Sequence, residues 1–203
     1  VMLEPTANRL QVGCVGSLHA RVTVRGTRAH SARPWQGDNA LYRALPVLER
    51  LRARERREVT IEGLPFFEVL TPTMASTANS RNVVPDRFDI NVNYRFAPGR
   101  HENDALQDLV ALVGDEGEVA LVDGAPSGAV CLRHPLVTEW IARARLEPEP
   151  KQAWTDVARL TAMGVAAVNM GPGDPAQAHQ AGEWVAVEAI DAGLAVLEAL
   201  VDR

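Results

Sequence analysis

Residues 88–96 place the strongest restriction on how this chain can fold. Apolar and polar residues alternate there without a break: Phe88, Asp89, Ile90, Asn91, Val92, Asn93, Tyr94, Arg95 and Phe96. A period of two puts the apolar side chains on one face of a strand and the polar side chains on the other. The segment therefore predicts a strand in a sheet that buries one face, and Pro98-Gly99 ends that strand.

The same reasoning predicts the elements around this strand. Periodicity indicates three further strands and two helices, in the order strand 18–24, helix 41–51, strand 68–77, helix 106–113 and strand 118–122. A strand, a helix, two or three strands, a helix and a strand form a ferredoxin-like pattern, which is an antiparallel sheet with two helices on one face. The exposed edge of such a sheet is commonly paired with a second copy of the chain.

The first helix has a cap and a charged tail. Asp38 or Asn39 can cap it, and its apolar residues recur at helical spacing: Leu41, Leu45, Leu48 and Leu51. Residues 50–58 carry charges of both signs, which is typical of a solvated helix face. We therefore expect the helix to continue through these charged residues.

The composition changes after residues 124–128, which read Gly-Ala-Pro-Ser-Gly. The later elements are predicted as helix 135–146, helix 155–163, strand 165–170, a turn-rich loop at 171–175 and helix 185–201. In the last helix we expect an inward face formed by Ile190, Leu194, Leu197 and Val201. Because helices alternate with a strand, this order favours an α/β unit with a parallel sheet. We expect two units, an α+β domain of residues 15–123 inserted into an α/β domain of residues 1–14 and 124–203.

Composition excludes several classes of protein. The formal net charge is −5 and the isoelectric point is about 5.6, which disfavours binding to nucleic acid or to an anionic membrane surface. No apolar run is long enough to cross a bilayer, and residues 1–5 have no signal-peptide pattern. Cys14 and Cys131 cannot form a disulfide scaffold. These features favour a cytoplasmic globular protein.

Three residues are candidates for chemistry because of where they lie. His30 and His179 occupy loops that are dense in glycine, proline and small polar residues, whereas His19, His101 and His134 are interpreted as structural or solvated. Glu4, near the start of the chain, becomes a candidate only when it is considered with these two histidines and their flanking residues.

Several motifs together resemble a known family. They are LEPT (3–6), GSLHARVTVRGTRAHSARPWQGDNA (16–40), NVVP (82–85), NYRF (93–96), AWTDVARL (153–160) and GPGDPAQAHQAGEWV (171–185). In type and order they are similar to the di-zinc amidohydrolases that include succinyl-diaminopimelate desuccinylase, acetylornithine deacetylase and carboxypeptidase G. The actinobacterial desuccinylases carry the most similar WTDVARL and VNMGPGDPAQAH segments. The resemblance implies the C-terminal portion of a zinc-peptidase-like α/β catalytic domain with an inserted α+β dimerisation domain.

The resemblance also implies roles for individual residues. Glu4 and His179 match metal ligands for two zinc ions, and cobalt or manganese suits the same ligand types. His30 matches a histidine that reaches into the partner's active site and stabilises an oxyanion. The remaining matches concern substrate binding and comprise Asn82, Arg95, Thr155, Asp156, Gly171 and Gly173. Arg95 suits a substrate carboxylate because its planar fork makes two parallel hydrogen bonds.

The chain departs from the family pattern at one important point. The H-x-D motif, the bridging aspartate and the paired glutamates precede the EPT motif in this family, and neither an H-x-D motif nor a Glu-Glu pair occurs in the chain. We therefore expect an incomplete C-terminal part, inactive alone, of a homodimeric amide hydrolase. Its implied substrate is an N-acyl amino acid, N-succinyl-LL-diaminopimelate, and its products are succinate and LL-diaminopimelate for lysine biosynthesis.

Three alternatives remain open. The first is a sister enzyme that removes a different acyl group, such as acetylornithine deacetylase, because a few substitutions in a pocket can change the acyl group accepted. The second is a non-catalytic dimerisation or interaction module. The third is RNA binding by the ferredoxin-like sheet, which is disfavoured because only 5% of the residues are aromatic and no basic-aromatic strand motif is present.

Overall fold

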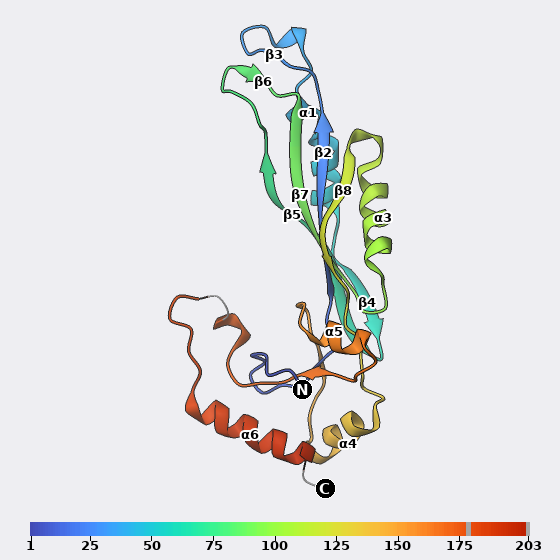
Figure 1. Ribbon diagram of the computed structural model, residues 1–203, viewed down its shortest axis with the longest axis vertical. Helices are drawn as coiled ribbons and strands as arrows, with labels where there is room; N and C mark the ends of the chain where they lie inside the picture. The colour runs from blue at the N-terminus through green and yellow to red at the C-terminus, as the bar shows by residue number, and fades with distance from the viewer. Residues whose placement is uncertain (178–179, 202–203) are drawn as a thin grey trace.

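A computed structural model describes residues 1–177 and 180–201. Figure 1 shows two parts, a tall sheet with helices along it and a smaller base that holds the N-terminus and the last helices. Two chain crossings join them, and the crossings pair with each other: Cys14 and Gly128 exchange backbone hydrogen bonds of 3.2 and 2.9 Å. The expected α/β class with an α+β sheet domain is therefore confirmed.

The tall part is a five-stranded antiparallel sheet in the order β4-β5-β7-β2-β8. Its strands are β2 (Gly16–Arg25), β4 (Arg57–Ile61), β5 (Leu64–Ser76), β7 (Arg87–Phe96) and β8 (Glu118–Ala125). The predicted central strand β7 pairs with β2 along its whole length, with Tyr94 opposite Leu18 and Arg87 opposite Arg25. Beyond one end of this sheet, a small ribbon of β3 (Ala29–His30) and β6 (Val83–Val84) forms a tip (Figure 1).

Three helices cover one face of this sheet. They are α1 (Ala40–Arg43), α2 (Leu45–Ala53) and α3 (Glu102–Val113), and their buried residues share one core with the apolar faces of β2 and β7. Asn39 caps α1, as its side chain accepts a hydrogen bond of 2.9 Å from the Leu41 amide. The predicted apolar stripe is confirmed at Leu51, which is buried, and at Leu48, which packs against the core. Leu41 and Leu45 are exposed, and Ala40, Ala44 and Val47 are buried instead.

The charged segment after α2 does not continue the helix as expected. The helix ends at Ala53, and residues 57–61 form β4, which pairs with β5. Glu62 and Gly63 connect the two strands, with φ values of +50° and +83°. Two consecutive residues with positive φ are typical of the tight turns that match the twist of a hairpin. Pairing with β5 therefore overrides the local charge pattern.

A buried carboxylate joins β5 to β7 and α3. Glu68 accepts hydrogen bonds from the Ala97 amide, Tyr94, Arg57 and Arg100, at 2.5–3.0 Å. Burial by itself raises the pKa of Glu68, but the Ala97 amide and the two guanidinium groups outweigh it, so the pKa lies below its usual range. Burial and the neighbouring Glu68 raise the pKa of Tyr94. This network joins β5 to β7 and to the segment after β7 at the end of the sheet nearest the base.

The base is built around a small three-stranded sheet in the order β10-β1-β9. It comprises β1 (Gln11–Val12), β9 (Glu149–Pro150) and β10 (Val168–Asn169), and it is mixed, not parallel as expected: β1 pairs with β9 in parallel and with β10 antiparallel. Three helices accompany it, α4 (Pro135–Ala144), α5 (Val157–Ala162) and α6 (Val187–Val201). A short 3-10 turn at 175–177 also belongs to the base, whereas those at 34–36 and 114–116 belong to the sheet domain.

The last helix buries less than the sequence predicts. Leu197 packs against the core that contains Trp140, whereas Ile190, Leu194 and Val201 are 47%, 55% and 71% exposed. The one fully buried position that α6 contributes is Gly193, where a Cβ atom would lie 2.6 Å from Oδ1 of Asn8. The N-terminal segment therefore docks on α6 while an apolar side of the helix stays open.

The structure also describes the two cysteines and the length and apolar character of the helices. Cys14 is buried and Cys131 is half-buried, and both are free thiols. Within residues 1–177 and 180–201, none of the helices has the length and apolar character needed to cross a bilayer.

Candidate functional site

His30 and Asn82 lie together at the tip of the sheet domain. Strands β3 and β6 pair His30 with Val83, and the Ser31 amide donates a 2.9 Å hydrogen bond to the Asn82 carbonyl oxygen. The Ala32 amide donates to Nδ1 of His30 at 3.0 Å, so the neutral ring carries its hydrogen on Nε2. Both side chains are exposed, and His30 is thus prepared to donate a hydrogen bond from Nε2.

Glu4 lies at the base, beside the turn that contains Gly171 and Gly173. The amides of Thr6 and Ala7 donate to the carbonyl oxygens of Gly171 and Gly173 at 3.2 and 2.7 Å. A Cβ atom at Gly171 would lie 2.7 Å from the carbonyl oxygen of Glu4, which explains why glycine is needed there. The structure therefore brings together these three predicted residues, whereas His179 lies outside the described residues.

A buried polar cluster lies next to this turn. Thr155 is 4% exposed, and its hydroxyl oxygen has no hydrogen-bond partner in the described part of the chain. The carbonyl oxygen of Thr155 accepts a weak hydrogen bond from the thiol of Cys14 at 3.7 Å. A buried hydroxyl without a hydrogen-bond partner is uncommon. Such a group is suited to form a hydrogen bond with a ligand.

Lys151 belongs to the same cluster, and the sequence analysis missed it. It is 7% exposed, and burial lowers its pKa while the nearby Glu4 and Cys14 partly oppose that shift. Lys151 is the single lysine of the chain, which was the one signal available in the sequence. Its proximity to Glu4 adds a cation to the predicted ligand region.

A pocket of about 550 Å³ opens between the sheet domain and the base. The sheet domain contributes Ser17, His19, Arg95 and residues 123–125 to its lining, and the base contributes Ala153, Trp154 and Arg159. Nε of Arg95 donates to Oδ1 of Asn93 at 3.0 Å, and no carboxylate among the described residues forms an ion pair with this guanidinium. A half-buried guanidinium without an anion is suited to bind a carboxylate from a ligand.

Asp156 is not among the residues that line this pocket, and its carboxylate is already engaged by Arg159, which does line it. Oδ1 of Asp156 accepts a 2.8 Å hydrogen bond from Arg159, whose guanidinium also lies 5.1 Å from the centre of the Trp154 ring. The Asp156 side chain makes no capping hydrogen bond to α5. It therefore shapes the Arg159 wall of the pocket.

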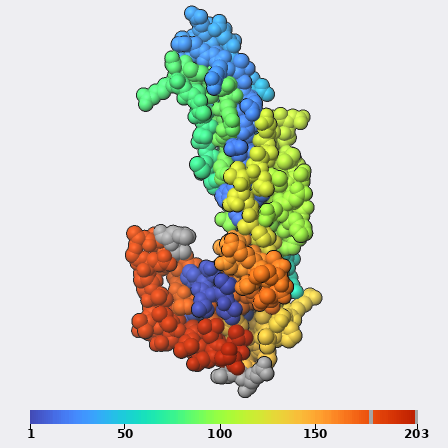
Figure 2. Space-filling view, viewed as in Figure 1, coloured from blue at the N-terminus to red at the C-terminus, as the bar shows by residue number. Residues whose placement is uncertain are grey.

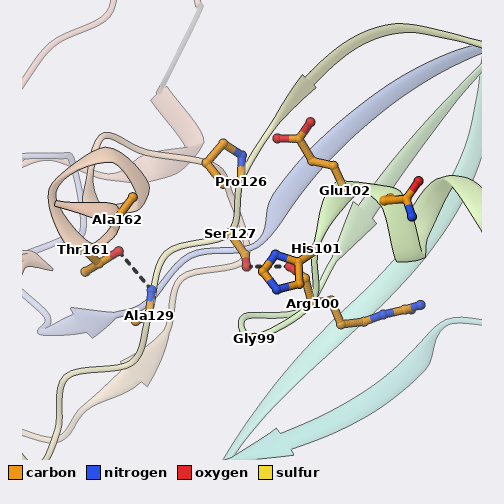
Figure 3. A pocket seen from close by; sticks show the side chains of 10 residues that line it. Gly99, Arg100, His101, Glu102, Pro126, Ser127, Ala129, Thr161 and Ala162 are labelled. Atoms are coloured by element: carbon orange, nitrogen blue, oxygen red, sulfur yellow. Dashed lines mark hydrogen bonds between the residues drawn. The ribbon is translucent and has the colours of Figure 1, made fainter. Parts of the chain in front are cut away.

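A second cavity, of about 570 Å³, lies on the other side of the junction (Figure 3). Arg100, His101, Ser127 and Thr161 line part of it, and Ser127 and Thr161 tie the junction together through hydrogen bonds to the Arg100 carbonyl oxygen and the Ala129 amide. None of the predicted site residues within the described ranges lines it.

The two groups of predicted residues are far apart within one chain. His30 and Asn82 lie beyond the start of β7, and Arg95 lies near its end. A ten-residue strand spans about 30 Å. The structure therefore does not bring the tip residues to Glu4, Arg95 and Thr155 of the same chain, and Figure 2 shows the tip standing well clear of the base.

The described residues do not form a metal centre by themselves. Within residues 1–177 and 180–201, no three His, Cys, Asp or Glu side chains are grouped so that they could hold a metal ion. Glu4 is a suitable oxygen ligand, but a two-metal site needs several further ligands. The described residues therefore do not supply the ligand set for the two zinc ions that the resemblance implies.

Comparison with known proteins supplies the context for this arrangement. Residues 12–120 match the model of the M20 peptidase dimerisation domain. The chain is 40% identical to succinyl-diaminopimelate desuccinylase of Corynebacterium glutamicum over 200 residues, which cover 96% of this chain and 54% of the relative. It is 33% identical to acetylornithine deacetylase of Myxococcus xanthus, covering 83% and 48% of the two chains. The chain therefore spans about half the length of the curated relatives it matches.

Solved structures agree with this assignment at the level of fold. An M20 family metallo-carboxypeptidase from Sulfolobus solfataricus superimposes with a TM-score of 0.68 at 14% identity, covering 98% of this chain and 61% of that protein. The matched residues 12–120 contain β2, β4, β5 and β7 of the sheet completely and the first three residues of β8. The chain belongs to the M20 peptidase dimerisation domain family.

Proposed function

We propose that this chain supplies the dimerisation domain and the C-terminal catalytic part of a succinyl-diaminopimelate desuccinylase. The reaction is hydrolysis of N-succinyl-LL-diaminopimelate to succinate and LL-diaminopimelate in the cytoplasm, a step of lysine biosynthesis. The observation that carries this proposal is the unpaired guanidinium of Arg95 in the 550 Å³ pocket, because the substrate is rich in carboxylates. The 40% identity with the Corynebacterium glutamicum desuccinylase supports the same substrate.

Activity in this proposal requires an N-terminal metal-binding half, and we call the two halves together the complete enzyme. Exposed apolar side chains provide a surface for that half: Leu3, Trp184, Val187, Ile190 and Leu194 are between 47% and 66% exposed. Large apolar side chains that are exposed in this way are suited to an interface with a further part of the protein. Glu4 and His179 would then contribute ligands to two metal ions that polarise the amide carbonyl and activate water.

The remaining residues divide between two subunits. Arg95 and Thr155 bind the substrate of their own subunit, with Asp156 placing Arg159, while Gly171 and Gly173 shape the turn beside Glu4. His30 and Asn82 reach the site of the partner subunit, where Nε2 of His30 donates to the developing oxyanion. This division accounts for the long separation between the tip and the base.

A homodimer is the second part of the proposal. Residues 70–76 of β5 extend beyond β4, so one edge of this strand is unpaired among the described residues. Leu41, Tyr42, Leu45 and Met74 are 38–73% exposed on α1, on α2 and on this part of β5. An open strand edge with apolar neighbours is suited to pair with a second copy of the chain.

Hydrolysis by the complete enzyme tests the proposal. We expect faster turnover of N-succinyl-LL-diaminopimelate than of N-acetylornithine, and a KM at least about tenfold higher after Arg95→Ala, since one charged contact accounts for about 1.4 kcal/mol. Arg133→Ala is the control, because this side chain is 88% exposed. Faster hydrolysis of N-acetylornithine would instead support the acetylornithine deacetylase alternative.

A non-catalytic dimerisation module is the other alternative, and the match of residues 12–120 to a dimerisation domain favours it for the isolated chain. Metal analysis separates the two. The complete enzyme should bind two metal ions and the 203-residue chain should not, whereas a complete enzyme without metal and without hydrolysis would support the module.

A further inference from the structure

The open face of the sheet carries a continuous line of polar side chains that ends at the pocket. From β5 to β7 and β2, hydrogen-bond distances link Thr73 to Asn91 (2.6 Å), Asn91 to His19 (3.2 Å) and His19 to Asn93 (3.2 Å). Asn93 then accepts from Arg95 at 3.0 Å. Helices cover the opposite face of the sheet, so this line is separate from the core.

Only one orientation of the Asn93 side-chain amide is compatible with the hydrogen-bond donors and acceptors around it. Its oxygen accepts from Nε of Arg95, and its nitrogen donates to the Leu18 carbonyl oxygen at 3.1 Å and to Oγ of Ser17 at 3.2 Å. The amide nitrogen also faces Nε2 of His19 at 3.2 Å, so its two hydrogens are shared among three acceptors. The imidazole accepts from Asn93 in the tautomer that carries its hydrogen on Nδ1. His19 thus helps to hold Asn93 in the orientation that Arg95 requires.

The contact at Nε leaves the two terminal nitrogens of Arg95 for another partner. A free arginine side chain has large rotamer entropy, and fixing the plane of its guanidinium group before binding lowers the entropic cost of binding an anion. His19 and Arg95 also line the same pocket, together with Ser17, Asp123 and Arg159. The imidazole and the guanidinium are therefore linked through Asn93 at the edge of one cavity.

We propose that His19 and Asn93 are positioning residues that hold the Arg95 guanidinium ready for a carboxylate ligand. The network is independent of the reaction, although the identity of that carboxylate as part of an N-succinyl substrate rests on the proposed function. His19 is thereby assigned a role that its place on the polar face of a strand did not suggest.

Binding of succinate to the 203-residue chain tests this role, because His19, Asn93 and Arg95 all belong to it. Nuclear magnetic resonance titration should show affinity about tenfold weaker after His19→Ala or Asn93→Ala, as expected for one hydrogen bond to a charged group. His19→Gln should recover most of the affinity, because its amide oxygen can accept from Asn93. His134→Ala, which changes an exposed histidine on the base, should have no effect.

The decisive comparison is a double-mutant cycle. If His19 acts through Arg95, His19→Ala should change succinate affinity less than about twofold in the Arg95→Ala protein. An undiminished effect in that background, no rescue by His19→Gln, or no succinate binding by the unmutated chain would overturn the proposal. The succinate titration does not depend on hydrolysis. Loss of the proposed activity in the complete enzyme and loss of the coupling between His19 and Arg95 are therefore separate results.

Discussion

At Glu68, burial and charge pairing act on the same carboxylate in opposite directions. The side chain is 1% exposed and contacts both Arg57 and Arg100, which makes it a buried charge with full compensation. The Ala97 amide adds a hydrogen bond from the end of β7. The carboxylate therefore joins the hairpin of β4 and β5 to the start of the loop that leads to α3.

Replacing this carboxylate should destabilise the protein most strongly at neutral pH. Glu68→Gln leaves Arg57 and Arg100 without their shared anion and should lower the free energy of unfolding by ~3 kcal/mol. Glu68 has a folded-state pKa below its ordinary value of 4.5, so its contribution is present above that value and is lost as pH falls through the folded pKa.

Urea unfolding at several pH values measures this effect. The difference between the unmutated protein and Glu68→Gln should shrink as the solution becomes acidic below about pH 4.5. Glu139→Gln is the matched control, because this carboxylate is 60% exposed and should have little effect. An equal loss at every pH would contradict the role assigned to the charge of Glu68.

At the scale of elements, the turn between β4 and β5 depends on backbone conformation alone. Gly63 has φ +83°, and a Cβ atom placed there meets nothing within 4 Å. Gly63→Ala should therefore destabilise the protein by about 1 kcal/mol through strain at positive φ without any clash. Thermal unfolding measures this change.

Gly63→Asn provides the control for the hairpin, because asparagine tolerates positive φ better than alanine. We expect it to recover part of the lost stability. Equal stability of Gly63→Ala and the unmutated protein would show that the turn does not hold the conformation described.

The apolar surface of α1 and α2 leads to a prediction about assembly. Leu45→Glu places a charge on a side chain that is 51% exposed, so the fold should survive while the dimer weakens. Sedimentation should show a dimer for the unmutated chain and a shift towards monomer for the variant. Leu136→Glu, at 54% exposure on α4 of the base, should leave the dimer intact, and equal weakening by both variants would contradict this interface.

Strong local periodicity explains which elements the sequence predicted correctly. β7 alternates over its whole length, and its partners β2 and β5, together with β8 beyond β2, were predicted near their observed positions. β4 was missed because residues 50–58 carry mixed charges that resemble a solvated helix face. The strand that follows is determined by its pairing with β5. The inward faces of α2 and α6 were predicted only in part, because helical spacing alone does not determine which apolar stripe faces the core.

The candidate site was predictable for a different reason. Glu4 and Gly171 are 167 positions apart, and only the family resemblance suggested that they meet. Lys151 and His19 lack such motifs, and their importance depends on burial and on hydrogen bonds between strands. Local spacing carries no information about contacts of that kind.

At the scale of the whole molecule, the sheet domain places the tip far from the base of its own chain. Figure 1 shows β3 and β6 at one end and the N-terminal segment at the other. The junction is held by the paired crossings at Cys14 and Gly128, by two hydrogen bonds between Phe67 and Gln152, and by the contacts around Ser127 and Thr161. This separation supports the proposal that His30 completes the site of a second subunit.

Mixing two inactive variants of the complete enzyme tests that claim most directly. Glu4→Ala removes a metal ligand, and His30→Ala should lower turnover by roughly two to three orders of magnitude while leaving the metal content unchanged. After the subunits are exchanged, mixed dimers contain one site with intact Glu4 from one subunit and intact His30 from the other. Activity should return to about a quarter of the unmutated level, because half of the dimers are mixed and each has one intact site. No recovery, in dimers shown to have exchanged, would contradict a site shared between subunits.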